Sequence, residues 1–148
     1  MKWFFCFSAL LVGATVLCQT APPVSKQFIT LETIGHGYWK PNRPFGIRVY
    51  STPDGTKVTV KYLTFSSRAE AKEYLRTCLR PEAEIIYKQE KKGPDGEVVG
   101  ERLIATSQQS GKEEFALIRG VRLNYHFFGS SSLAAAQQVE AEELAEKW

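Results

Sequence analysis

Two short turn sequences, Pro53-Asp54-Gly55 and Gly93-Pro94-Asp95-Gly96, constrain the fold of this chain more than any other feature. Proline presets the backbone angle φ that such a turn requires, and glycine accepts the left-handed conformation that closes it. The segments that flank the two turns read as strands, at 45–50 and 58–63 and at 84–90 and 97–106. Strand-like segments on both sides of a tight turn predict a β-hairpin. We therefore expect two hairpins.

Two helices are also expected. Ser67 and Glu70 form a capping box in front of an apolar stripe, and Pro81 stops the helix, so the first spans about 67–80. The second spans about 132–147, where alanine favours helix and the many acidic residues predict a largely solvated surface.

The remaining segments complete an α+β fold. Residues 27–34 alternate loosely and are expected to be a strand, and the apolar runs 115–119 and 121–128 are expected to form one bent strand or two strands broken at Gly120. Strands joined by tight turns predict an antiparallel sheet. Because the two helices do not alternate regularly with the strands, we expect both helices to pack on one face of the sheet. Adjacent apolar pairs such as Ile85-Ile86 place apolar groups on both faces. We therefore expect a strongly curved sheet, or a second face that is poorly covered.

The beginning of the chain is typical of an export signal. Lys2 precedes a run from Trp3 to Cys18 that contains no charged residue and is short for a membrane span. The predicted organisation is a signal peptide at 1–20, a flexible leader at 21–26 and a single α+β domain at 27–148. Export predicts a secreted or periplasmic protein that meets the membrane only through its signal segment and does not bind nucleic acid.

Cysteine and histidine are scarce. Cys6 and Cys18 lie in the predicted signal peptide, so Cys78 is the only thiol of the exported chain and no internal disulfide is expected. Cys78 shares a helical stripe with Leu75 and Leu79, which predicts a buried, inert side chain. The two histidines, His36 and His126, have no ligand spacing around them, so we expect neither a metal site nor a cofactor.

The most unusual local composition lies between Gly35 and Pro44, where two glycines and two prolines predict a loop. Aromatic and basic side chains on such a loop are typical of ligand or partner recognition, and the alternative is an aromatic lid over the sheet. The candidate binding residues are His36, Tyr38, Trp39, Lys40 and Arg43.

No nucleophile elbow, phosphate-binding loop or catalytic triad is recognisable in the sequence. This favours a non-enzymatic binding or interaction module, with an unknown protein, a small apolar ligand or a second copy of the chain as partner. One alternative is a small hydrolase or transferase that uses His126 or His36 with a carboxylate such as Glu101. Another is a structural envelope protein that self-associates through an uncovered sheet face.

Overall fold

The structure, a computed structural model, describes residues 29–144 and confirms the α+β fold with an antiparallel sheet. The predicted signal peptide, the predicted leader 21–26 and residues 145–147 of the predicted last helix lie outside the described residues. The seven strands are β1 (Thr30–Lys40), β2 (Arg43–Ser51), β3 (Lys57–Thr64), β4 (Glu84–Lys92), β5 (Val98–Gln109), β6 (Lys112–Val121) and β7 (Asn124–Ser130). The helices are α2 (Arg68–Cys78) and α3 (Leu133–Leu144).

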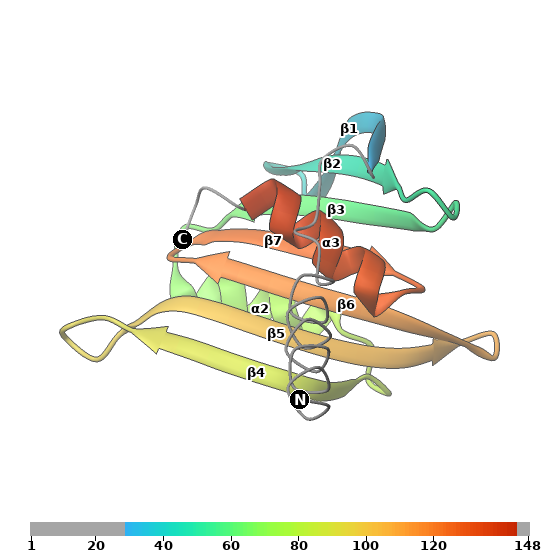
Figure 1. Cartoon of the computed structure of the whole chain (residues 1–148). Coiled ribbons are helices and arrows are strands. Elements are labelled where there is room, and N and C mark those ends of the chain that lie inside the picture. The colour runs from blue at the N-terminus through green and yellow to red at the C-terminus, as the bar shows by residue number, and fades with distance from the viewer. Residues whose placement is uncertain (1–28, 145–148) are drawn as a thin grey trace, which may run out of the picture.

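All seven strands form one sheet in the order β1-β2-β3-β7-β6-β5-β4, and every neighbouring pair is antiparallel. The sheet is made of two meanders, β1 to β3 and β4 to β7, which join where β3 pairs with β7. Helix α2 carries the chain from the middle of the sheet to its far edge. The sheet is curved but does not close into a barrel, so β1 and β4 remain as its two edges (Figure 1).

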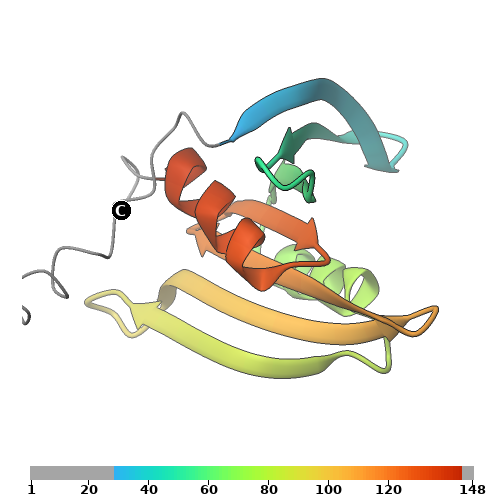
Figure 2. The same cartoon turned by 45° about the vertical axis from the view of Figure 1, so that its right-hand side comes forward.

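The two helices lie on opposite faces of the sheet, so the prediction that both pack on one face is wrong (Figure 2). Adjacent strand residues explain why, because neighbours along a strand point to opposite faces. Leu117 and Phe128 belong to the core beneath α3, whereas Ile118 and Phe127 belong to the core beneath α2. Each face therefore has an apolar core of its own and its own covering helix.

The predicted turns and the first helix cap are confirmed. Gly55 and Gly96 have φ values of 85° and 79°, the left-handed conformation for which glycine is suited. At the start of α2, the Ser67 hydroxyl accepts a hydrogen bond of 3.1 Å from the backbone N–H of Glu70.

The predicted loop at 35–44 is instead a hairpin. Strand β1 continues to Lys40, and β2 starts at Arg43 after a two-residue turn. Gly37 is needed for close packing within this hairpin, because a Cβ there would lie 2.7 Å from the Phe45 ring. Pro44 lies next to the start of its strand, a position where proline is tolerated. These residues therefore did not mark a break in the sheet.

Helix α3 is far less solvated than its composition predicts. Five of its twelve residues are buried, namely Ala135, Ala136, Val139, Glu140 and Leu144. It covers the centre of the second sheet face, so that face is not left bare as one reading of the sequence suggested. No helix within residues 29–144 is long and apolar enough to cross a membrane.

Candidate functional site

A row of directly opposed residues, one from each strand, crosses the sheet on the face that carries α3. We call it the cross-strand row; it consists of His36, Gly46, Tyr62, His126, Arg119, Arg102 and Gln89. Both histidines of the chain and two arginines lie in it. The row therefore gathers polar and aromatic groups that are far apart in the sequence onto one line of the sheet.

The neighbouring row on the same face has a different character. Its central residues, Val60, Phe128, Leu117 and Ile104, are buried beneath α3. At the next position on the same face of each strand, the buried apolar side chains are thus replaced by the members of the cross-strand row. This boundary is where an apolar ligand would meet polar groups that can orient it.

Two glutamates of α3 fix the helix to arginines of this face. Glu140 accepts two hydrogen bonds from Arg102, both 2.8 Å, and one of 2.8 Å from Arg119. Glu143 accepts bonds from Arg48, the closest at 3.0 Å, and from the Tyr50 hydroxyl. The Arg102–Glu140 pair is bidentate, and such pairs are geometrically specific, so it orients the Arg102 guanidinium group in the row.

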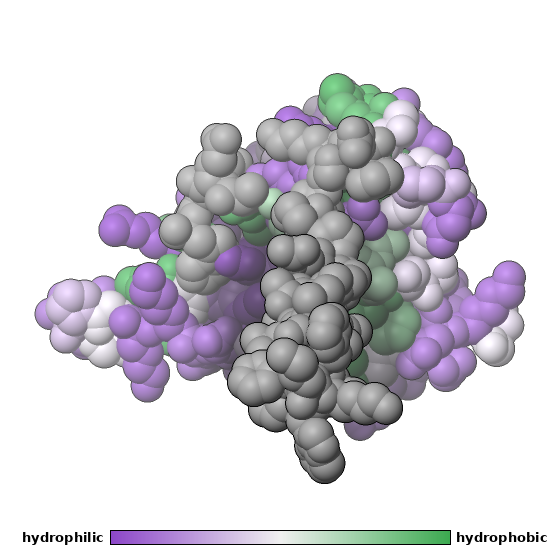
Figure 3. All heavy atoms as spheres, in the orientation of Figure 1, coloured by the Kyte–Doolittle hydropathy of each residue, from purple (hydrophilic) through white to green (hydrophobic). Residues whose placement is uncertain are grey.

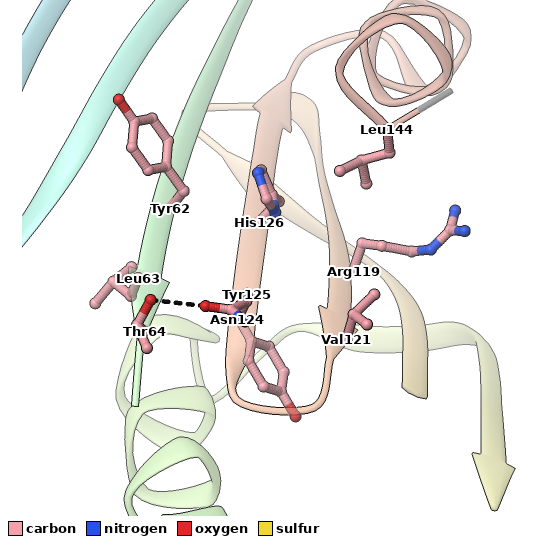
Figure 4. Close-up of a pocket in the computed structure, with 9 residues that line it drawn as sticks. All are labelled: Tyr62, Leu63, Thr64, Arg119, Val121, Asn124, Tyr125, His126 and Leu144. Carbon is pink, nitrogen blue, oxygen red and sulfur yellow. Dashed lines mark hydrogen bonds between the residues drawn. The ribbon is translucent and has the colours of Figure 1, made fainter. Parts of the chain in front are cut away.

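A pocket of about 410 Å³ opens where the end of α3 meets the cross-strand row (Figure 4). We call it the Tyr62 pocket. Its lining residues are Tyr62, Leu63, Thr64, Arg119, Val121, Asn124, Tyr125, His126 and Leu144. Figure 4 shows Tyr62 and His126 on neighbouring strands, with Leu144 of α3 above Arg119, on the side of His126 that faces away from Tyr62. The pocket therefore combines aromatic and aliphatic walls with a few polar groups.

The aromatic wall is held in place by its neighbours. The Tyr62 ring lies over Gly46, where an added Cβ would come within 2.1 Å of the ring. The Tyr62 and His126 ring centroids are 6.0 Å apart, and the Arg48 guanidinium lies 5.4 Å from the Tyr62 centroid. Such contacts fix a flat surface on which a planar or apolar group can pack.

Thr64 and Asn124 form a hydrogen-bonded polar pair in the pocket. The Thr64 hydroxyl donates a 2.8 Å hydrogen bond to the Asn124 side-chain oxygen, which orients the amide NH₂ of Asn124 as a donor (Figure 4). Asn124 is exposed and pairs with Val121 across β6 and β7. The arrangement can bind and orient a ligand.

The five candidate binding residues predicted from the sequence are not brought to one place. His36 and Tyr38 lie on the face that carries α3, with ring centroids 6.1 Å apart, and His36 is the first member of the cross-strand row. Trp39 packs on the other side against Phe65 and Tyr74 of the α2 core, at centroid distances of 6.0 and 5.0 Å.

The two basic members of the predicted set contact α2. Lys40 Nζ lies 3.6 Å from a Glu73 carboxylate oxygen, and Arg43 lies 3.0 Å from a carboxylate oxygen of Glu70. These ion pairs, with Trp39, tie the β1–β2 hairpin to the helix. A binding role for the five residues stays a prediction.

His126 and Glu101, which were predicted as a possible catalytic pair, lie on opposite faces of the sheet. His126 lies in the cross-strand row, whereas Glu101 is on the α2 face and is 5% exposed. There Glu101 accepts a 2.8 Å bond from the Tyr125 hydroxyl and another of 3.2 Å from Arg68. Burial and the bond to Glu101 raise the pKa of Tyr125 well above its usual value. This cluster has the properties of a structural buried network.

Cys78 is exposed, so the prediction that it is buried in the core is wrong. It is the last residue of α2, between Leu75 and Leu79, which are partly buried against the α2 core. Its sulfur is nevertheless turned toward the helix backbone, 3.6 Å from the Leu75 carbonyl oxygen. Local burial of the thiol raises its pKa to about 11, which does not suit a nucleophile.

Among residues 29–144, no group of three or more histidine, cysteine or acidic side chains is placed to hold a metal ion. No family model matches the chain, and neither the curated proteins nor the solved structures contain a match.

Proposed function

We propose that the protein is a non-enzymatic binding module that holds a small, mainly apolar ligand in the Tyr62 pocket. One observation carries the proposal: the pocket opens at the boundary between the apolar core of α3 and the polar cross-strand row. The packing surface comes from Tyr62, His126, Val121 and Leu144. The side-chain amide of Asn124 supplies a hydrogen-bond donor. A few polar groups in a mostly apolar hollow are typical of small-molecule sites.

The enzymatic alternative has less support. A His–carboxylate site needs the two groups within hydrogen-bond reach, directly or through one water. His126 and Glu101 project from opposite faces of the sheet, and Glu101 already accepts bonds from Tyr125 and Arg68.

Self-association has two favourable features: the exposed Leu31, Ile34 and Tyr38 on edge strand β1, and the exposed triplet Ile85, Ile86 and Tyr87 on edge strand β4. The same strand shifts register between Ile85 and Tyr87 and carries lysines at 88, 91 and 92. Bulges and lysines are devices by which natural edge strands discourage pairing with another chain. Ligand binding is therefore the better-supported function.

The proposal can be tested with N-phenyl-1-naphthylamine, an uncharged dye that fluoresces in apolar surroundings. We expect saturable binding at one site per chain, and we expect Val121→Trp to abolish it by filling the pocket. Val98→Trp is the matched control, because Val98 is also half-buried at a strand end but does not line the pocket. Absence of saturable binding, or equal binding by the two variants, would contradict the proposal.

We also propose that the protein is exported through its first 20 residues, on the basis of the uncharged run from Trp3 to Cys18. N-terminal sequencing of the product from a secretion-competent host should give a first residue between Gln19 and Ser25. Recovery of a soluble product that retains Met1 would contradict export.

A further inference from the structure

Strand β1 forms one edge of the sheet, and among residues 29–144 it pairs with β2 alone (Figure 1). The outer side of an edge strand presents backbone N–H and C=O groups that can pair with a strand from another chain. Strand β1 is also long, with eleven residues from Thr30 to Lys40. Its outer side is therefore a template for one further strand.

The edge of β1 carries exposed apolar side chains on the face of the sheet that carries α3. Ile34 is 69% exposed and Tyr38 is 63% exposed, whereas Ile85 on the opposite edge strand is 51% exposed. Ile34 and Tyr38 alternate with His36 on this face, because the three lie opposite alternate residues of β2. A strand that pairs with β1 can cover these side chains as well as the backbone.

The middle of β1 lacks the features that protect β4 from pairing with another chain. Both register shifts of β1 lie near its ends, between Leu31 and Thr33 and between Tyr38 and Lys40. The six residues from Thr33 to Tyr38 pair regularly with β2 and include no lysine. This regular segment therefore has neither the bulge nor the lysines that discourage pairing at an edge.

The regular segment is complementary to itself when two copies pair antiparallel. With His36 of one copy opposite His36 of a second copy, Ile34 of each copy lies opposite Tyr38 of the other. Directly opposed residues in an antiparallel pair point to the same face. Each exposed isoleucine is therefore covered by a tyrosine of the other copy, and such pairs of an aromatic and a β-branched residue stabilise a sheet.

Other symmetric registers leave these apolar side chains uncovered. A two-fold axis that pairs two edge strands antiparallel is perpendicular to the sheet, so it brings together residues of the same face. Moving the axis one residue toward the start of β1 places Tyr38 opposite Glu32. Moving it one residue toward the end places Ile34 opposite Lys40. The register centred on His36 is therefore the favoured one.

The glycines on the reverse face of this segment fit the same register. Gly37 accommodates the Phe45 ring of its own chain, whereas a Cβ at Gly35 would meet no atom within 4 Å, and Gly35 does not have a positive φ. Pairing centred on His36 places Gly35 opposite Gly37 of the second copy, and so beside the Phe45 ring of that copy. Glycine within a strand often marks such a close approach of another backbone.

We propose that two copies of the chain pair antiparallel through their β1 strands, centred on His36, and form one continuous sheet. The interface is isologous, since each copy contributes the same residues to it. The cross-strand row then continues from one copy into the other through the two His36 residues. An interface of one strand pair is small, which predicts a weak and reversible dimer. The proposal is independent of ligand binding in the Tyr62 pocket.

Sedimentation equilibrium of the exported chain tests the assembly. We expect a monomer–dimer equilibrium over roughly a hundredfold range of protein concentration that reaches about 1 mM. Ile34→Lys puts a charge opposite Tyr38 of the second copy and should raise the dissociation constant at least about tenfold. Ile85→Lys is the matched control, because Ile85 is an exposed isoleucine on the other edge strand, and it should leave the dissociation constant unchanged.

Disulfide cross-linking tests the register, in the exported chain with Cys78→Ser so that the introduced cysteine is the single predicted thiol. His36→Cys should form a covalent dimer, because directly opposed Cα atoms lie roughly 4.5–5.5 Å apart, within the range that a disulfide spans. Ile34→Cys alone should cross-link far more slowly, since its two copies are offset by about 13 Å along the strands. A mixture of Ile34→Cys and Tyr38→Cys chains should cross-link as His36→Cys does.

Three results would overturn the proposal. A chain that stays monomeric up to about 1 mM does not pair with a second copy, and its β1 edge is then left for a strand of a different protein. A dimer that Ile85→Lys weakens as much as Ile34→Lys does not form through β1. Equal rates of cross-linking for His36→Cys and for Ile34→Cys alone would exclude the register centred on His36. Selective weakening by Ile34→Lys, together with the predicted order of cross-linking rates, supports it.

Discussion

At the scale of single residues, Glu140 carries the strongest electrostatic contacts of α3. It is 5% exposed, and its carboxylate is shared by Arg102 and Arg119. Burial by itself would raise the pKa of Glu140, but the hydrogen bonds and charges of the two guanidinium groups outweigh it and hold the pKa below the usual value. The ionised form is therefore the one that the folded protein stabilises.

Glu140→Gln should lower the free energy of unfolding at pH 7 by about 3 kcal/mol, because it leaves two guanidinium groups beside a neutral amide. Since the folded pKa is depressed, the contribution of Glu140 is present above its ordinary pKa of 4.5 and is lost as pH falls through the folded value. Urea unfolding measured from pH 7 to pH 3 should show that the difference in free energy of unfolding between parent and variant becomes smaller below about pH 4.5. Exposed Glu113 is the control, and an equal effect of Glu113→Gln would contradict the assignment.

Cys78 combines an exposed position with a thiol whose pKa is raised to about 11. In the native protein it should react completely with a maleimide, but at pH 8 roughly a hundredfold more slowly than free cysteine, because the thiolate fraction is that much smaller. Cys78→Ser should change stability by no more than about 0.5 kcal/mol, as for other surface sites. Incomplete labelling before unfolding would show that the side chain is buried after all.

At the scale of elements, β1 shows how alternation along a strand assigns neighbouring residues different roles. Trp39 packs into the α2 core, whereas Tyr38 is 63% exposed on the other face. Trp39→Ala should therefore lower the free energy of unfolding by about 2 kcal/mol, less than for a fully buried tryptophan, and Tyr38→Ala by less than about 0.5 kcal/mol. Thermal unfolding of the two variants provides the comparison. Equal losses of stability in the two variants would contradict the assignment of Trp39 and Tyr38 to opposite faces of β1.

The elements that the sequence predicts well are those specified by local chemistry. Pro53-Asp54-Gly55 and the Ser67 cap act within a few residues, and both form as expected. Gly37 was misinterpreted because its role depends on the Phe45 ring across the hairpin, a contact that local composition does not reveal. The opposite placement of the two helices likewise depends on the pairing of β3 with β7, which are about 60 residues apart.

The candidate site was harder to predict for the same reason. The cross-strand row exists only because seven strands are in a particular register, and its members come from almost the whole described chain. The sequence points to His36 through its place in a predicted loop and to His126 as a candidate catalytic histidine, and neither reason involves the row. Tyr62, Arg102 and Arg119 gave no signal, because isolated arginines and tyrosines on strands are ordinary surface residues. Alternation within β3, β5 and β6 could have placed them on a common face once the strand order was known.

At the scale of the whole molecule, a single sheet has one apolar core on each face, and its two edge strands face solvent. Apolar side chains remain exposed on the edge strand β1, where Ile34 is 69% exposed, and Figure 3 shows hydrophobic surface at this edge. The centre of the sheet is different. Leu117 and Ile118 are adjacent in β6, both are almost completely buried, and they belong to opposite cores. The two faces therefore share the same backbone.

This shared backbone predicts that the two faces unfold together. Loss of α3 would expose Leu117 and Phe128 and remove the packing that holds β6 and β7 against water, so the α2 core on the reverse side would lose its support. Small single domains usually unfold in one cooperative transition for this reason. Glu140→Gln, which acts on the α3 face, should therefore also destabilise the environment of Trp39 on the α2 face.

The test uses the exported chain with Trp148→Phe, in which Trp39 is the single tryptophan because Trp3 lies in the predicted signal peptide. Urea unfolding is followed by Trp39 fluorescence and by far-ultraviolet circular dichroism, with and without Glu140→Gln. Both signals should give one midpoint, and the substitution should lower it equally in both with little change in the slope of free energy against urea. If the circular dichroism transition moves to lower urea while the Trp39 transition stays in place, the two faces are independent, because α3 can then be lost while the α2 core persists.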